Sequence, residues 1–470
     1  MTTPFDNETR YDLVIVGGGT AGCVLASRLS EDASRTVLLL EAGPVYSPDN
    51  YPAASQNIDG NTVEPEFIWG YQSMPGSPPH SIAAYAGRLL GGGYAINGGI
   101  ARRARRDDFE RWQKHGLSSW SFDQVIETYK ALEATSVGED EWHGRSGIWP
   151  IWQPAVDEIN ETAQAFLEAA KGTGFAYISD FNGEHQHGVG LEPRNIVGSR
   201  RLNTGMIYLS DKVRARPNLT IRGQAHVDRV VLSEKHAKAV RLANGELIPA
   251  KEIILCSGVY GSPAILMRSG IGPKEHLQAL QIEVQQEAPV GQHFQEQPMF
   301  PLSFLLKKKA KGAPPDGSIA VWTRSAETSE QELDLQLTAF VQPDISDTGE
   351  QINRLNIWAS VVLPQSVGTV RLKSPDPLVT PRIDYHLLEK DSDRKRLKEI
   401  MKIARNIVAS EPLASLVKME LSPGPDVVND VDFDRAIAGS AGIYYHATST
   451  VPMGMQDANA VVDDQGACTV

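Results

Sequence analysis

The N-terminal part of the chain carries two apolar runs separated by a glycine-rich turn and a segment of helical periodicity. Residues 11–16 form a continuous apolar and β-branched run, which is typical of a strand buried on both faces. Residues 23–29 place apolar side chains at helical spacing, and residues 36–40 form a second buried run. Strand, glycine turn, helix and strand within about thirty residues predict a βαβ unit with a right-handed crossover.

Downstream, the pattern predicts irregular segments, short strands and several helices. Helical periodicity begins after Ser121, an N-cap candidate, and β-branched runs are typical of strands. The predicted helices are 119–133, 159–171 and 391–410; the predicted strands lie between 218 and 256, as a meander returning to a parallel strand, and at 333–341 and 355–363; the predicted loops are 46–86 and 306–318.

Composition narrows the class of protein. The 470 residues are 41% apolar, and 45 basic against 58 acidic residues give a net charge of −13. This balance disfavours nucleic acid or an anionic membrane as the main partner, because phosphate binding needs a basic field. The sequence contains no apolar run long enough for a membrane span, and its N-terminus lacks the pattern of a signal peptide, so we expect a cytoplasmic protein. Three widely separated cysteines predict neither a disulfide framework nor a metal site.

The turn after the first predicted strand has the spacing of a dinucleotide-binding fingerprint. Gly17 permits the tight turn, Gly19 lets the backbone approach a pyrophosphate, and Gly22 allows close packing of helix on strand. Glu41 follows the second strand, where an acidic side chain can accept hydrogen bonds from ribose hydroxyls. The residues predicted to bind the cofactor in this unit are Gly17, Gly19, Thr20, Ala21, Gly22, Glu41 and Ala42.

A second glycine-rich loop follows at residues 87–99. Consecutive glycines let the backbone pass against a flat ring or a diphosphate where no Cβ would fit. Asn97 supplies a donor and an acceptor for the polar edge of such a ring. Arg88 is interpreted either as a pyrophosphate contact or as part of a structural salt bridge. The candidate binding residues of this loop are Arg88, Leu90, Gly91, Gly92, Asn97, Gly98 and Gly99.

Three segments resemble the signatures of the glucose–methanol–choline (GMC) oxidoreductases. Residues 87–99 resemble the flavin-loop signature, 258–273 the second signature, and 290–296 the segment that follows it. The resemblance implies FAD in an N-terminal dinucleotide fold, with Val227, Ser257, Gly258 and Ser262 as further binding residues. The sequence departs from the family pattern at Gly93-Tyr94, Val259 and Glu296-Gln297. Tyr94 would change the shape and polarity of the site beside the flavin.

The resemblance also implies a catalytic base. His446 and the residues up to Gly454 are similar to the histidine motif of the family, in which the histidine takes the hydroxyl proton while hydride moves to flavin N5. A neutral imidazole with a near-ambient pKa suits this role, and the alternative is a structural histidine. In some members a histidine tethers FAD covalently, but its position here is about Ala84, and His80 lies four residues too early, so we expect noncovalent FAD.

The predicted fold is α/β, with a discontinuous Rossmann-like FAD-binding domain interleaved with an α+β substrate domain that contains an antiparallel sheet. The FAD-binding domain is assigned to 1–155, 195–290 and 440–470, and the substrate-binding domain to 156–194 and 291–439. Since the chain stops at Val470, it is expected to lack the family's C-terminal segment, which would supply a second proton-handling residue.

The predicted function is oxidation of a small-molecule alcohol to a carbonyl. The electron acceptor is left open between oxygen, a quinone and a carrier protein. Three alternatives stay open: a hydroxynitrile-lyase-like enzyme with structural FAD, an incomplete or non-catalytic subunit, and an NAD-dependent dehydrogenase. The last does not account for the second glycine loop or for residues 262–273.

Overall fold

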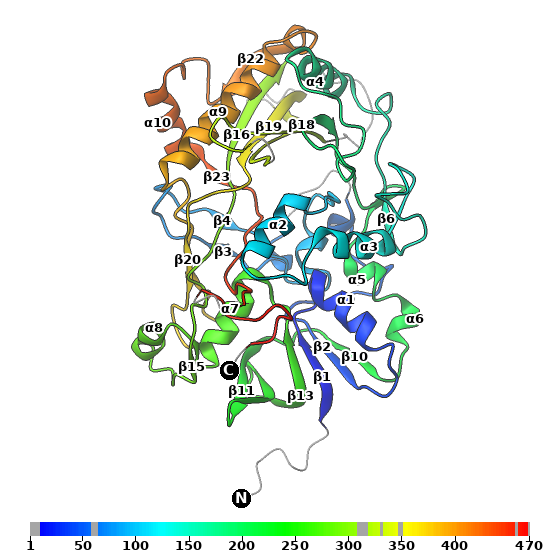
Figure 1. Cartoon of the computed structure of the whole chain (residues 1–470), viewed down its shortest axis with the longest axis vertical. Helices are drawn as coiled ribbons and strands as arrows, with labels where there is room; N and C mark the ends of the chain where they lie inside the picture. Colours follow the sequence, from blue (N-terminus) through cyan, green and yellow to red (C-terminus); the bar gives the residue numbers. More distant parts are fainter. Residues whose placement is uncertain are drawn as a thin grey trace, which may run out of the picture.

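The computed structural model describes residues 10–57, 64–307, 318–329, 332–345, 351–455 and 459–468. Two sheets organise these residues, one at each end of the long axis of the molecule (Figure 1). The lower sheet contains the predicted βαβ unit, and the upper sheet is antiparallel. The C-terminal segment, drawn in red, runs from the upper sheet down to the lower one.

The lower sheet has the strand order β10-β2-β1-β13-β12-β11. Its first four strands are parallel, and β11–β13 form an antiparallel meander, as predicted. Helix α1 follows β1 directly and buries Cys23 and Ala26 against the sheet. These elements are β1 (Tyr11–Val16), α1 (Thr20–Leu29), β2 (Val37–Leu40), β10 (Leu219–Arg222), β11 (Val227–Ser233), β12 (His236–Leu242) and β13 (Leu247–Leu255).

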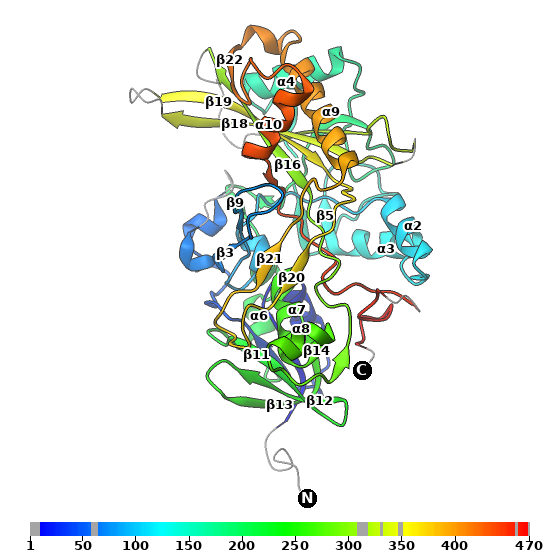
Figure 2. The same ribbon diagram turned by 90° about the vertical axis from the view of Figure 1, so that its left-hand side faces the viewer.

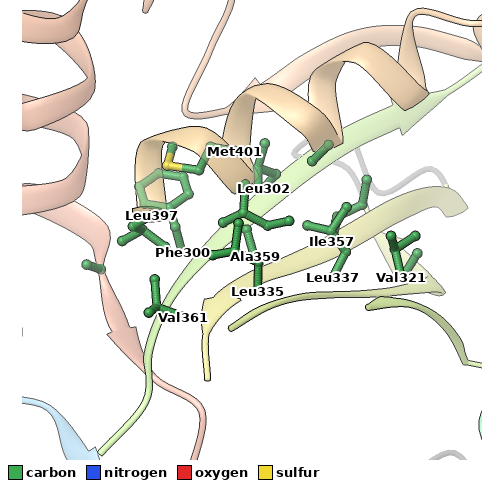
Figure 3. Close-up of a cluster of buried hydrophobic side chains, with 14 of the residues drawn as sticks. Phe300, Leu302, Val321, Leu335, Leu337, Ile357, Ala359, Val361, Leu397 and Met401 are labelled. Atoms are coloured by element: carbon green, nitrogen blue, oxygen red, sulfur yellow. The ribbon is translucent and has the colours of Figure 1, made fainter. Parts of the chain in front are cut away.

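The upper sheet has the order β22-β16-β19-β18-β17-β7, and β23 also pairs with β16. Side chains alternate between its two faces, and one face packs against α9 and α4. Phe300, Leu302, Leu397 and Met401 meet in this core (Figure 3). The elements are α4 (Glu161–Gly172), β7 (Gly188–Leu191), β16 (Pro298–Leu306), β17 (Ile319–Thr323), β18 (Leu335–Ile345), β19 (Gln351–Val361), α9 (Asp391–Val408), β22 (Val417–Ser422), α10 (Asp430–Ser440) and β23 (Gly442–Ile443).

Shorter elements fill the space between the sheets and cover their edges (Figure 2). Ser121 caps α3 as predicted, because its hydroxyl accepts a hydrogen bond from the Gln124 amide at 3.3 Å. The remaining helices and strands are β3 (Tyr71–Gln72), β4 (Ala83–Ala84), α2 (Arg106–Lys114), α3 (Phe122–Leu132), β5 (Glu133–Thr135), β6 (Trp149–Ile151), β8 (Ile196–Val197), β9 (Arg200–Arg201), α5 (Thr204–Ile207), α6 (Asp211–Arg214), α7 (Gly258–Arg268), β14 (Ile271–Gly272), α8 (Lys274–Ala279), β15 (Gln286–Glu287), β20 (Thr369–Arg371) and β21 (Arg382–Asp384). Single turns of 3₁₀ helix lie at Ala53–Gln56, Pro65–Phe67, Gly92–Ala95 and Leu413–Ser415.

Several predicted elements differ from the structure in detail. The predicted loop 46–86 contains the short strands β3 and β4, and the predicted loop 306–318 lies mostly outside the described residues. The predicted division of the chain into two domains stays a prediction. Strand β23, which that division placed in the nucleotide-binding part, pairs with β16 in the upper sheet. None of the helices in the described ranges is long and apolar enough to cross a membrane.

Candidate active site

The first glycine loop joins β1 to α1 at the carboxyl end of the lower sheet. Gly17 has φ +105°, a left-handed conformation that favours glycine. A Cβ on Gly22 would lie 1.9 Å from the Gly17 carbonyl oxygen, which explains why only glycine fits there. A Cβ on Gly19 would meet no protein atom closer than 3.9 Å, so the space beside Gly19 is open. The N-terminus of α1 therefore presents free amides to an open space, as an anion site requires.

That space belongs to a cavity of about 750 Å³. The cavity runs along both glycine loops and is large enough for a dinucleotide or another ligand of similar size. It is lined by most of the residues predicted to bind the cofactor: Gly17, Gly19, Thr20, Ala21, Glu41, Ala42, Arg88, Gly92, Val227, Ser257, Gly258 and Ser262. The two glycine loops touch here, because a Cβ on Gly92 would lie 2.7 Å from the Gly19 Cα.

The other predicted binding residues do not line this cavity: Gly22, Leu90, Gly91, Asn97, Gly98 and Gly99. Leu90 is fully buried in the core beneath the loop. The side chain of Asn97 accepts a hydrogen bond from the Gly99 amide at 2.9 Å, and the Gly98 carbonyl accepts one from Arg194. These hydrogen bonds fix the conformation of the loop. Tyr94 likewise turns away, donating a hydrogen bond to the Ile100 carbonyl at 3.2 Å.

Glu41 is buried at the edge of the cavity, with 6% of its surface exposed. Its two carboxyl oxygens accept hydrogen bonds from the amides of Gly18 and Gly43, both at 2.8 Å. Burial raises the pKa of Glu41, while these hydrogen bonds and the charge of Arg88 oppose that shift. Each oxygen keeps a further lone pair for a hydroxyl group bound in the cavity.

Arg88 lines the same cavity, with its guanidinium 5.3 Å from the ring centre of Trp69. It forms no ion pair with any described residue, so the interpretation as a structural salt bridge is not supported. Its Nε is buried and has no hydrogen-bond partner among the described residues. A buried, unpaired donor on a cation beside the cavity fits an anionic ligand.

A two-stranded ribbon borders both this cavity and a second one of about 430 Å³. The ribbon consists of residues 295–297 and 444–448 and lies between the two sheets (Figure 1). Gln295 and Thr448 exchange backbone hydrogen bonds of 3.1 and 2.9 Å. Tyr445 and Ala447 line the larger cavity, whereas His446 and Thr448 line the second, and Glu296 lines both.

His446 has the hydrogen bonding of a base. Its Nδ1–H donates to the Gln297 side-chain oxygen at 2.7 Å, which assigns the proton to Nδ1, and none of the described residues forms a hydrogen bond with Nε2. His446 is exposed to the second cavity, but the protein around the ring removes part of its solvation, and this desolvation of the imidazolium lowers the pKa of His446 to about 4. The value is below the near-neutral pKa expected from the sequence.

Several residues of the two cavities were not singled out from the sequence. Trp69, Tyr71, His226 and Arg268 line the larger cavity. Arg111, Trp112, Glu332 and Arg396 line the second one, and together with His446 these residues come from four separate segments of the chain. The sequence marked Glu296 in one way, as a departure from the family pattern, but that departure did not indicate that the side chain is buried.

Fold and site together define a protein that binds a dinucleotide cofactor beside a separate, smaller pocket containing a histidine. The family model described as GMC oxidoreductase matches in two parts, over residues 11–299 and 364–469. The chain belongs to this family, and FAD is its cofactor.

The C-terminal match corrects one prediction. Residues 364–469 match the C-terminal domain of the family, so that domain is present, whereas the sequence analysis expected the family's C-terminal segment to be missing. The error arose from placing the domain beyond Val470, although β20–β23, α9 and α10 already belong to the matched residues. The incomplete-subunit alternative loses the observation that motivated it.

Similar proteins extend over nearly the whole chain. A GMC-type oxidoreductase of Rhodococcus erythropolis, itself described as uncharacterised, is 33% identical and covers 97% of this chain and 90% of its own length. An oxygen-dependent choline dehydrogenase of Rhizobium etli is 30% identical, with 97% and 88% covered. Among solved structures, a pyridoxine 4-oxidase from Mesorbium loti superposes with a TM-score of 0.87 at 29% identity, covering 97% of this chain and 91% of that one. A formate oxidase superposes with a TM-score of 0.84 at 22% identity, with 97% and 91% covered, which shows the shared fold.

Proposed function

We propose that this protein oxidises the CH–OH group of a small alcohol to a carbonyl. Bound FAD would supply the hydride acceptor at its N5. His446 Nε2 would take the hydroxyl proton, so that the substrate loses one hydride and one proton in total. The observation that supports the proposal is the hydrogen bond of His446 Nδ1 to Gln297, which leaves Nε2 without a partner among the described residues.

The residues that would hold FAD are those of the larger cavity. The amides at the start of α1 and the guanidinium of Arg88 would bind the pyrophosphate, and Glu41 would accept ribose hydroxyls. Ala83 and Ala84 form β4, and neither can form a covalent link to a flavin. His80 is engaged elsewhere, its Nε2 lying 3.1 Å from the Ala441 carbonyl oxygen. We therefore propose dissociable FAD.

The second cavity favours a polar alcohol without a formal charge. The described residues that line it offer one aromatic ring besides His446, that of Trp112. Its two arginines are already paired, Arg111 with Glu332 at 2.9 Å and Arg396 with Asp334 at 3.1 Å. A quaternary ammonium group, as in the substrate of the choline dehydrogenase relatives, prefers aromatic faces or an unpaired carboxylate. Hydrogen-bonding groups dominate instead, which supports a neutral, hydroxylated substrate.

Anaerobic reduction of the flavin tests this function. Purified holoenzyme is mixed without oxygen with a panel of neutral polyols, pyridoxine and choline, and the loss of flavin absorbance is followed. Bleaching by a neutral alcohol, with a matching carbonyl product, is the expected result. Release of cyanide from a cyanohydrin without bleaching would instead support the lyase alternative, and no bleaching with any alcohol would overturn the proposal.

A further inference from the structure

The ribbon between the two cavities contains an irregularity centred on Glu296. The Tyr444 amide donates to the Gln297 carbonyl, and the Thr448 amide donates to the Gln295 carbonyl. Three residues, 445–447, therefore stand opposite Glu296 alone. Tyr445 adopts φ +64°, a left-handed conformation that accommodates the extra length. Main-chain amides in this bulge face no ladder carbonyl and need another acceptor.

The Glu296 side chain supplies that acceptor. Its Oε1 accepts hydrogen bonds from the amides of Gln297 and His446, each at 2.8 Å. Its Oε2 is buried and has no hydrogen-bond partner among the described residues. Only 3% of the residue is exposed, although it borders both cavities. Oε1 thus accepts two main-chain hydrogen bonds and the Ala447 amide also acts on the carboxyl, while no described residue forms a hydrogen bond with Oε2.

The two arginines that line the second cavity with Glu296, Arg111 and Arg396, are paired with Glu332 and Asp334. The titratable groups that interact with Glu296 carry no positive charge to stabilise an ionised carboxylate. They are the phenols of Tyr260 on α7, of Tyr385 after β21 and of Tyr445, together with the neutral His446 across the ribbon. No lysine or arginine among the described residues forms an ion pair with Glu296. Burial raises its pKa to about 8, against the effect of the backbone hydrogen bonds.

We propose that Glu296 is a positioning residue for His446, held as a neutral carboxylic acid that fixes the main chain of His446 through Oε1 and leaves no charge beside the imidazole. The inference deepens the proposed function and rests on it for the role of His446. An ionised carboxylate at this place would stabilise the imidazolium and so change the base that the substrate meets. The neutral form keeps the boundary between the cavities uncharged.

Folding stability tests the protonation state without any turnover. Urea unfolding of the holoenzyme, at saturating FAD, is measured from pH 5 to 9 for wild type, E296Q and the exposed control E283Q. A carboxyl that stays protonated when folded but ionises when unfolded favours unfolding as pH rises. The unfolding constant of wild type relative to E296Q should therefore rise about tenfold per pH unit up to about pH 8, and then level off. E283Q should show no such trend, and a constant ratio for E296Q would overturn the proposal.

Kinetics test the positioning role. E296A removes the acceptor of the His446 amide, and kcat for flavin reduction should fall about tenfold to a hundredfold with KM changed by less than about threefold. E296Q keeps an oxygen for both amides and should recover most of that loss, while the limb of the pH profile near 8 disappears. If E296A does not fold, E296D, which shortens the same carboxyl, replaces it. Equal kcat in E296A and E283Q would overturn the positioning role.

The two experiments separate this inference from the proposed function. If wild type oxidises no alcohol, the proposed function fails, yet the unfolding comparison still decides whether Glu296 is neutral in the folded protein. If alcohols are oxidised and the unfolding ratio is constant with pH, the proposed function stands and the inference about Glu296 fails.

Discussion

Replacing Glu41 by alanine separates the contribution of this residue to folding from its contribution to FAD binding. The carboxyl is 6% exposed and bonds the amides of Gly18 and Gly43. Both amides belong to turns that carry the cofactor cavity, one in the first glycine loop and one just after β2. Alanine would leave both donors without their acceptor in a buried environment.

The size of the effect follows from these contacts. Each buried amide that loses its partner costs about 1–3 kcal/mol, so the loss of two partners in Glu41→Ala should lower the free energy of unfolding by about 2–6 kcal/mol. The loss of stability should lie in the lower part of this range. Burial disfavours the ionised form of Glu41, as its raised pKa indicates, so this carboxyl stabilises the wild type less than a well-solvated carboxylate would. Loss of one hydrogen bond from a ribose hydroxyl should weaken FAD by a further tenfold to hundredfold.

Two measurements check this prediction. Urea unfolding gives the change in stability, and titration of apoprotein with FAD, followed by flavin fluorescence, gives the dissociation constant. Glu31→Ala serves as a matched control, since Glu31 is exposed and its ion pair with Arg28 at 3.0 Å contributes little. An unchanged dissociation constant would remove Glu41 from the site, and a stability equal to that of the control would refute the hydrogen-bond argument.

Three further predictions follow from the same geometry. Gly19→Val should abolish FAD binding but preserve the fold, because its Cβ meets only open cavity; a yellow mutant with full FAD would contradict this. His446→Ala should slow anaerobic flavin reduction about 10²–10⁴-fold at unchanged FAD content, as stopped-flow measurement would show. His143 bonds Glu133 and Asp180 at 2.8 and 2.7 Å; burial opposes its charge, but these bonds raise its pKa. His143 should therefore contribute fully to the free energy of unfolding below about pH 6.5, and this contribution should be lost as the pH rises through the pKa of His143 in the folded protein. Urea unfolding of His143→Gln should not show this pH dependence.

Short-range sequence patterns were enough to predict the part of the site formed by the βαβ unit. The βαβ unit depends on contiguous apolar runs and on glycines whose roles are steric, and the structure confirms the tight contact of Gly22 with Gly17. Glu41 was predictable for the same reason, since the end of a parallel strand next to the first one must lie beside the glycine turn. The cap at Ser121 is also local. Each of these inferences needs only neighbours in sequence or one pairing of strands.

The second cavity could not be predicted in this way. Arg111, Glu332, Arg396 and His446 meet only after the upper sheet and α9 have packed, and no spacing in the sequence encodes that meeting. Asn97 shows a related difficulty, because its side-chain oxygen accepts a hydrogen bond within its own loop, and its role at a flavin edge stays a prediction. Chemistry alone names candidates, whereas long-range packing decides which of them face a cavity.

The ribbon shows how backbone geometry assigns side chains to one cavity or the other. The three residues of the bulge alternate between the cavities, since Tyr445 and Ala447 line the larger one and His446 the smaller. A shift of one residue in pairing would exchange His446 with a neighbour and remove the base from its pocket. The pair Gln295–Thr448 fixes one end of the register, and the carboxyl of Glu296 fixes the bulge by bonding the His446 amide. The position of the imidazole therefore depends on Glu296, which need not touch the substrate. Its carboxyl accepts the hydrogen bond that the bulge leaves without a main-chain acceptor.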